Sequence, residues 1–139
     1  MSEAKETPEA LLSRVNASPF YRLLGFEVVE VGEGMARVRM PFRQDLLQFQ
    51  GAVHGGAVFS IADAAVAVAL LTLAEPGEEA VTIEGKLNYL AKVTQGDLVA
   101  VGRVVHHGRS VALGDTEVFR SDGKLCAKGL MTYTLIHRR

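Results

Sequence analysis

Hydrophobic and polar positions change their spacing several times along the chain, and each spacing predicts a different element. From Pro8 to about Leu24 the apolar residues recur at helical intervals with a break at Ser18-Pro19, which predicts two short helices. From Glu27 to Val31 and from Met35 to Met40 the alternation has a period of two. Glycines lie between these two segments, so a β-hairpin is expected there.

The longest apolar stretch runs from Ala57 to Leu73 and is apolar on every side. It predicts a helix that the rest of the protein encloses. An irregular, glutamine-rich loop precedes it and ends at His54-Gly55-Gly56. The stretch is at the short limit for a membrane span, carries Asp63 and lacks basic flanks, so it is interpreted as a buried central helix and no membrane partner is expected.

Four more strands are predicted after the helix breaker at Pro76-Gly77. They cover Val81 to Leu90, Asp97 to His107, Ser110 to Arg120 and Leu125 to His137. Their short connections favour antiparallel pairing, because a parallel pair needs a crossover of about a dozen residues or more. The second half is therefore expected to be an antiparallel meander. The fold class is α+β, with a curved antiparallel sheet wrapped around one long central helix.

Composition narrows the domain organisation and the possible partners. A length of 139 residues suits one domain over residues 1–139, with 1–24 as an N-terminal helical segment. Lysine and arginine total 15 against 16 acidic residues, so no nucleic-acid partner is expected. The single cysteine, Cys126, allows no intramolecular disulfide, and His106-His107 lack further metal ligands nearby. No export signal is visible, and a cytoplasmic protein without a metal is expected.

Two features of the central helix are candidates for chemistry. A charged carboxylate such as that of Asp63 is energetically costly in an apolar helix unless it is paired, hydrogen-bonded or open to a cavity. A position at the solvent edge of the helix, or a hydrogen bond to nearby backbone, explains its presence equally well. His54-Gly55-Gly56 lies at the helix start, where free N–H groups carry about half a positive charge. These donors suit an oxyanion, and a plain loop-to-helix junction is the alternative.

The stretch from Gln48 to Gly56, followed by Asp63 in an alanine-rich helix, resembles the signature of the PaaI-like hot-dog thioesterases. That signature reads Asn-x-x-Gly-x-x-His-Gly-Gly, with a catalytic carboxylate seven residues after the last glycine. The similarity extends through the strand 81–89 and the turns 108–110 and 122–124. Gln48 stands where the family has asparagine; its side chain carries the same amide group but is longer. An aspartate at position 63 favours the aspartate-using branch over the glutamate-using aroyl-CoA enzymes.

The resemblance implies a catalytic role for five residues. The Gly55 N–H would bind the thioester carbonyl, while Asp63 of the opposite subunit would activate water or attack directly. Thr82 would help to hold that water. His54 and Gln48 are implied at the same site, where they would orient the loop, the substrate or the water.

The resemblance also implies that Gly56, Arg109 and Ser110 bind the substrate and its coenzyme A arm. Coenzyme A belongs to the substrate, so no separate cofactor is expected. The exposed edges of such a sheet favour pairing of two copies, and a dimer of dimers, a homotetramer, is expected.

The expected function is hydrolysis of a small, medium or aryl acyl-CoA thioester to the free acid and coenzyme A. A non-catalytic acyl-CoA sensor that uses the same pocket is the alternative from another class. A hot-dog hydratase or dehydratase would need a different arrangement of histidine and acid, which the sequence does not contain.

Overall fold

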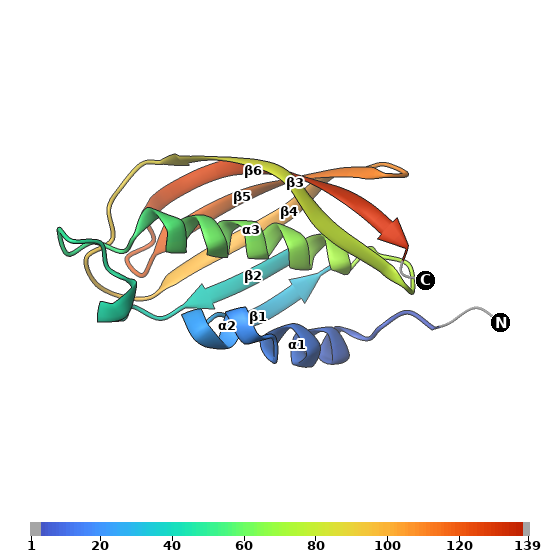
Figure 1. Cartoon of the computed structure of the whole chain (residues 1–139), viewed down its shortest axis with the longest axis horizontal. Coiled ribbons are helices and arrows are strands. Elements are labelled where there is room, and N and C mark those ends of the chain that lie inside the picture. Colours follow the sequence, from blue (N-terminus) through green and yellow to red (C-terminus); the bar gives the residue numbers. More distant parts are fainter. Residues whose placement is uncertain (1–3, 138–139) are drawn as a thin grey trace.

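The computed structural model describes residues 4–137, and its strands form one six-stranded antiparallel sheet that curves around a central helix (Figure 1). The expected architecture is therefore confirmed. The helices are α1 (Pro8–Asn16), α2 (Pro19–Leu24), the 3₁₀ helix η1 (Gln44–Leu46) and α3 (Gly55–Leu71). The strands are β1 (Glu27–Gly32), β2 (Met35–Met40), β3 (Glu78–Tyr89), β4 (Leu98–His107), β5 (Val111–Arg120) and β6 (Leu125–His137).

The strand order is β1-β2-β4-β5-β6-β3, so the predicted meander is correct only for β4, β5 and β6. The prediction that β3 pairs with β4 was wrong. After β3 the chain passes the start of α3, where the Val53 N–H donates to the Val93 carbonyl at 2.9 Å. This crossing carries β4 to the free edge of β2 and leaves β3 beside β6, at the far edge of the sheet. The turn residues between β3 and β4 do not indicate that the chain crosses the sheet in this way.

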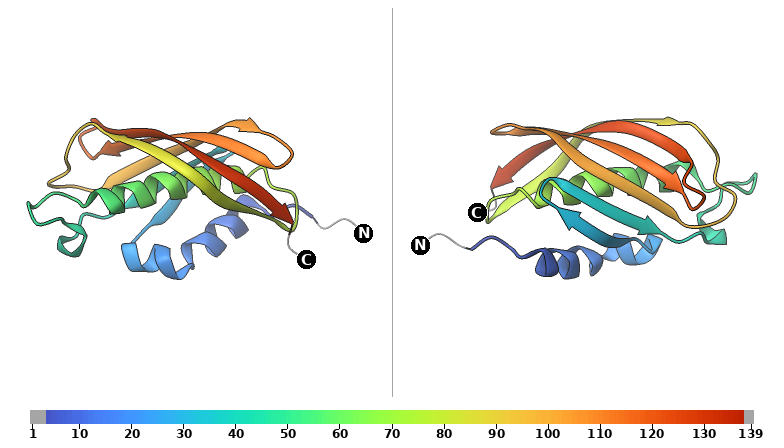
Figure 2. Two further views of the ribbon diagram at one scale, coloured as in Figure 1. Left: turned by 45° about the horizontal axis from the view of Figure 1, so that its top comes forward. Right: turned by 180° about the vertical axis from the view of Figure 1, so that it is seen from behind.

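The helix α3 lies on the concave side of the sheet, and the two views of Figure 2 show it enclosed there. Ten of its residues are buried, among them six alanines or valines in the stretch 62–69. Small residues on the sheet match this surface. A Cβ built on Gly102 of β4 would lie 2.4 Å from the Ala65 backbone, so only glycine permits this close approach. The sheet therefore holds α3 in one fixed position along its length.

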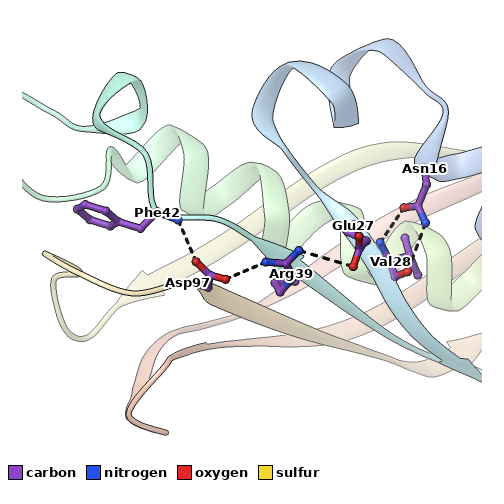
Figure 3. Close-up of polar contacts among 6 residues, drawn as sticks. All are labelled: Asn16, Glu27, Val28, Arg39, Phe42 and Asp97. Atoms are coloured by element: carbon purple, nitrogen blue, oxygen red, sulfur yellow. Dashed lines mark hydrogen bonds and ion pairs between the residues drawn. The ribbon is translucent and has the colours of Figure 1, made fainter.

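The β1–β2 hairpin shows the predicted alternation. Ala36, Val38 and Met40 of β2 are buried against the helix, whereas Arg37 and Arg39 point to the other face. Arg39 forms ion pairs with Glu27 of β1 and with Asp97 at the start of β4 (Figure 3). These ion pairs link β1, β2 and β4, the first three strands in the order of the sheet. They lie at the end of β2 from which the chain continues toward the start of α3.

The two predicted N-terminal helices, α1 and α2, are present, and they lie beside the β1–β2 hairpin (Figure 2). Pro8 and Pro19 occupy the first helical positions, which suit a residue without an N–H. The Asn16 side chain bonds both backbone groups of Val28 in β1: its amide donates to the carbonyl at 3.4 Å, and its oxygen accepts from the N–H at 2.7 Å (Figure 3). Asn16 thus takes the place of a neighbouring strand at this edge.

Candidate functional site

The start of α3 leaves one backbone donor without a partner. His54 is the N-cap, and its Nδ1 accepts from the Gly56 N–H at 2.7 Å. The His54 carbonyl accepts from the N–H groups of Ala57 and Val58 at 2.9 and 3.2 Å. Within residues 4–137 the Gly55 N–H has no acceptor in hydrogen-bond reach. It is therefore the donor that the helix dipole makes available to an anionic oxygen.

Tyr89, at the end of β3, fixes the adjacent peptide. Its hydroxyl donates to the Gly55 carbonyl at 2.7 Å, and a Cβ built on Gly55 would lie 3.4 Å from its ring. The peptide that links Gly55 to Gly56 is thus held from both sides, by Tyr89 at its oxygen and by His54 at its N–H. Gly56 itself has no free N–H for a ligand, and its predicted binding role stays a prediction.

Gln48 shapes the loop before the helix. Its side-chain oxygen accepts from the Gln50 backbone N–H, and its backbone N–H donates to the Ala52 carbonyl at 2.8 Å. Gly51 takes a φ of 88° in this turn, a conformation that favours glycine. Gln48, Gly55 and Tyr89 together line a cavity of about 320 Å³. The predicted cluster of Gln48, His54 and Gly55 is thus brought together around the helix start.

A second cavity, of about 290 Å³, lies on the other side of the helix start. His54, Gly56 and Ser60 contribute its polar wall. The remaining wall is largely apolar and consists of Phe20, Leu24, Leu46, Leu47 and Ala57 beside Asp45. Phe20 and the neighbouring Leu23 are more than half exposed, so α2 presents apolar side chains next to this space.

Asp63 lies two turns further along α3 and is only half-buried. The Thr82 hydroxyl on β3 is 3.2 and 3.3 Å from its two carboxylate oxygens. Tyr133 on β6 donates its hydroxyl to the Asp63 backbone carbonyl at 2.7 Å and also contacts Oδ1. Asp63 and Thr82, which the sequence singled out separately, are therefore in direct contact.

Strand pairing explains why these two side chains meet the helix at one point. Thr82 and Tyr133 are directly opposite each other in the β3–β6 pair. The register shifts between Thr82 and Glu84, so Ile83 is an additional residue on β3. Bulges of this kind bend a strand and re-aim its side chains. Here the bulge directly follows the threonine that contacts Asp63.

Two tyrosines near Asp63 are kept in their protonated form. Burial, followed by the nearby Asp63 carboxylate, raises the pKa of Tyr133 well above its usual value. The same two causes raise the pKa of Tyr21 on α2 to about 12. Tyr133 is therefore a hydroxyl donor throughout the range in which an enzyme works.

The sequence did not single out Tyr133 or Tyr89. In the sequence both are aromatic residues within long strands, where a core position is the ordinary interpretation. Tyr133 is separated from Asp63 by 70 positions, and Tyr89 from Gly55 by 34. For Tyr133, a hydroxyl among inward-facing aliphatic residues was the available signal, because a buried tyrosine oxygen needs a partner; Tyr89 is 53% exposed and carries no such signal.

Arg109 and Ser110 lie in the β4–β5 turn and are exposed. The Ser110 carbonyl accepts from the Leu135 N–H at 2.9 Å, which places the turn beside the end of β6. Within one chain this turn lies at the Asp63 end of the sheet and is not brought to Gly55. Asp63 lies eight positions after Gly55 on α3, which corresponds to a rise of about 12 Å.

Neither a metal site nor a membrane-spanning helix is found in the described part of the chain. No group of three or more histidine, cysteine or acidic residues comes together in residues 4–137 in the way metal ligands do. None of the helices in that range has the length and apolar character to cross a membrane. Cys126 is buried and borders the 320 Å³ cavity.

Comparison with known proteins places these features in a family. The family model described as the thioesterase superfamily matches residues 50–127. Acyl-coenzyme A thioesterase PaaI of Escherichia coli is 31% identical over 107 residues, which cover 76% of this chain and 74% of that protein.

Solved structures agree with the sequence match. The Escherichia coli PaaI protein from the phenylacetic acid degradation operon has a TM-score of 0.83 at 26% identity, covering 91% of this chain and 90% of that one. Conserved protein PA5202 from Pseudomonas aeruginosa has a TM-score of 0.84 at 33% identity, covering 94% and 100%. The chain belongs to the thioesterase superfamily as a PaaI-like hot-dog protein, and its reaction class is thioester hydrolysis.

Proposed function

We propose that this protein hydrolyses small, medium or aryl acyl-CoA thioesters to the free acid and coenzyme A. In this proposal the Gly55 N–H of one protomer binds the thioester carbonyl oxygen, and Asp63 of the partner subunit acts on the reacting water. The observation that carries the proposal is the half-buried Asp63 carboxylate, which an otherwise apolar helix holds next to the exposed Thr82 on an edge strand.

The separation of the two groups supports a site that two copies share. A water attacking a carbonyl carbon must lie within about 3 Å of both the carbon and its base. Gly55 and Asp63 of one chain are about 12 Å apart along the helix, so they cannot serve one carbonyl together. A second copy whose helix runs in the opposite direction would bring its Asp63 to the free Gly55 N–H.

The edge strand β3 supports the same assembly. It pairs with β6 on one side only, and Val81 and Ile83 on either side of Thr82 are about half exposed. An unpaired edge with apolar side chains is a surface on which another strand can add. Antiparallel pairing of two β3 strands around a two-fold axis would also run the two α3 helices in opposite directions.

The chemistry needs little else. The unpaired N–H at a helix start stabilises the charge that develops on the carbonyl oxygen, and a positioned carboxylate takes the proton of the attacking water. The thiolate of coenzyme A is a good leaving group, so a strong general acid is not required.

The test is an assay of short, medium and aryl acyl-CoA esters with released thiol as the readout, comparing wild type with Asp63→Asn. The variant keeps the size of the side chain and removes its charge. We expect kcat to fall by about 10²–10⁴ with an unchanged melting temperature, since a positioned base contributes that much. Wild-type turnover in the variant would contradict the assignment. Calorimetric binding of acyl-CoA without thiol release in the wild type would favour the non-catalytic sensor instead.

A further inference from the structure

We propose that Tyr133 is a positioning residue whose hydroxyl holds Oδ1 of Asp63, so that Oδ2 is the oxygen left to take a proton from water. This inference deepens the proposed function and rests on it for its catalytic meaning. The contact itself, and its effect on the carboxylate, can be measured without any substrate.

The environment of Tyr133 shows that its hydroxyl is directed at Asp63. Its side chain is only 1% exposed and belongs to the core of apolar residues, where a hydroxyl without a partner would be costly. The hydroxyl lies within reach of the Asp63 carbonyl oxygen, at 2.7 Å, and of Oδ1. A hydroxyl has one hydrogen, and a charged acceptor binds it more strongly than a neutral carbonyl does. The carboxylate therefore takes the larger share of this bond.

The two carboxylate oxygens consequently differ. Oδ1 has both Tyr133 and Thr82 in reach, whereas Oδ2 has Thr82 alone, at 3.3 Å. The Tyr133 side chain is rigid, because its ring is packed in the core and has only two torsion angles. The position of its hydroxyl is therefore fixed. The threonine is on the exposed edge strand. The fixed donor thus selects the rotamer of Asp63, and Oδ2 keeps lone pairs for a water.

The other groups around Asp63 do not compete for this role. Tyr21 on α2 is close enough for the Asp63 charge to raise its pKa, but its hydroxyl makes no hydrogen bond to the carboxylate. None of the ion pairs among residues 4–137 includes Asp63. Among the described residues, Tyr133 on β6 and Thr82 on β3 are thus the side-chain donors to this carboxylate.

A merely structural role for Tyr133 must be separated from the proposed one, and Thr116 provides the matched control. Thr116 on β5 is fully buried and donates its hydroxyl to the Ala62 carbonyl at 3.0 Å. This bond also joins a strand hydroxyl to a helix carbonyl, one residue before Asp63. It does not touch the carboxylate. Thr116→Val removes it with little change of volume, as Tyr133→Phe removes the tyrosine bond.

The experiment is a carbon-13 NMR measurement of the Asp63 carboxyl resonance, assigned with Asp63→Asn, in wild type, Tyr133→Phe and Thr116→Val. Loss of the tyrosine hydroxyl removes a hydrogen bond from the carboxylate, so the resonance should shift in Tyr133→Phe. Thr116→Val should give the wild-type resonance. An unchanged resonance in a folded Tyr133→Phe would overturn the proposal.

The same variants are then assayed for acyl-CoA hydrolysis. We expect kcat to fall about tenfold in Tyr133→Phe while KM changes less than about twofold, since the loss is in orientation, and Thr116→Val to keep the wild-type kcat. A shifted resonance without hydrolysis in the wild type would refute the proposed function and leave the Tyr133 contact standing. Hydrolysis with an unchanged kcat in Tyr133→Phe would refute the Tyr133 role alone.

Discussion

At the scale of single residues, the notable property of Asp63 is that hydroxyl groups hold it and cations do not. Thr82 and Tyr133 approach its carboxylate, and no lysine, arginine or histidine in residues 4–137 forms an ion pair with it. The two hydroxyl donors fix the direction of the carboxylate oxygens without placing a second charge in the site.

Thr82 should matter through its hydroxyl and not through its bulk. Thr82→Val keeps the branched shape and removes the donor, so we expect kcat for acyl-CoA hydrolysis to fall about tenfold, the loss of one hydrogen bond to a charged group. Thr82→Ser keeps the donor and should retain most of the activity. Equal loss in both variants would indicate that packing of β3 matters, and that the hydroxyl does not.

The sequence predicted these residues unequally for a physical reason. Asp63 was recognisable because a charge in an apolar helix is unusual wherever it occurs. Thr82 was named only through the family resemblance, which placed it beside the reacting water and did not predict its contact with Asp63. Tyr133 was missed, because its contact with Asp63 joins residues 70 positions apart and depends on how β6 packs against the helix.

At the scale of elements, α3 carries both halves of the proposed chemistry, and each half depends on how the helix is held. Its first turn presents the Gly55 N–H because His54 and Tyr89 occupy the groups on either side. Its middle presents Asp63 at the edge of the sheet. The sheet fixes the helix through close contacts such as that between Gly102 and Ala65, so neither group has room to drift.

Gly55 allows a direct test of the backbone donor. Gly55→Pro removes the N–H at the first helical position, where proline is well tolerated, and the ψ of 136° at His54 lies in the range preferred by a residue before proline. We expect kcat to fall by about 10²–10³, the cost of losing one oxyanion donor. Gly55→Ala keeps the N–H, adds a Cβ at ordinary contact distance from Tyr89, and should stay within about tenfold of wild type. Full activity in the proline variant would exclude the Gly55 donor.

Most elements were predictable from local pattern, whereas their order in the sheet was not. Alternation along β2 and the apolar run of α3 depend on burial of one face or of all faces, which the sequence records directly. The place of β3 beside β6 depends on the route of residues 90–97 past the start of α3. That route is set by tertiary packing, so it cannot be predicted from the local sequence.

At the scale of the whole molecule, the proposed site requires two copies, which makes a complementation experiment decisive. Asp63→Asn and Gly55→Pro, each nearly inactive alone, are mixed, unfolded and refolded together. Half of the resulting dimers pair one copy of each variant, and such a dimer contains one site with both groups intact. Activity should recover to roughly a quarter of wild type for a two-fold symmetric assembly. Recovery no greater than the sum of the separate variants would show that each chain works alone.

The two edges of the sheet differ in a way that bears on how many copies can join. At β1 the amide of Asn16 already bonds the main chain of Val28, whereas β3 has a partner on one side only. A sheet open on both sides could recruit copy after copy into a ribbon without end. With Asn16 bonded to the main chain of Val28 at the β1 edge, the proposed strand addition at β3 would join two copies in a closed pair and would not continue through β1.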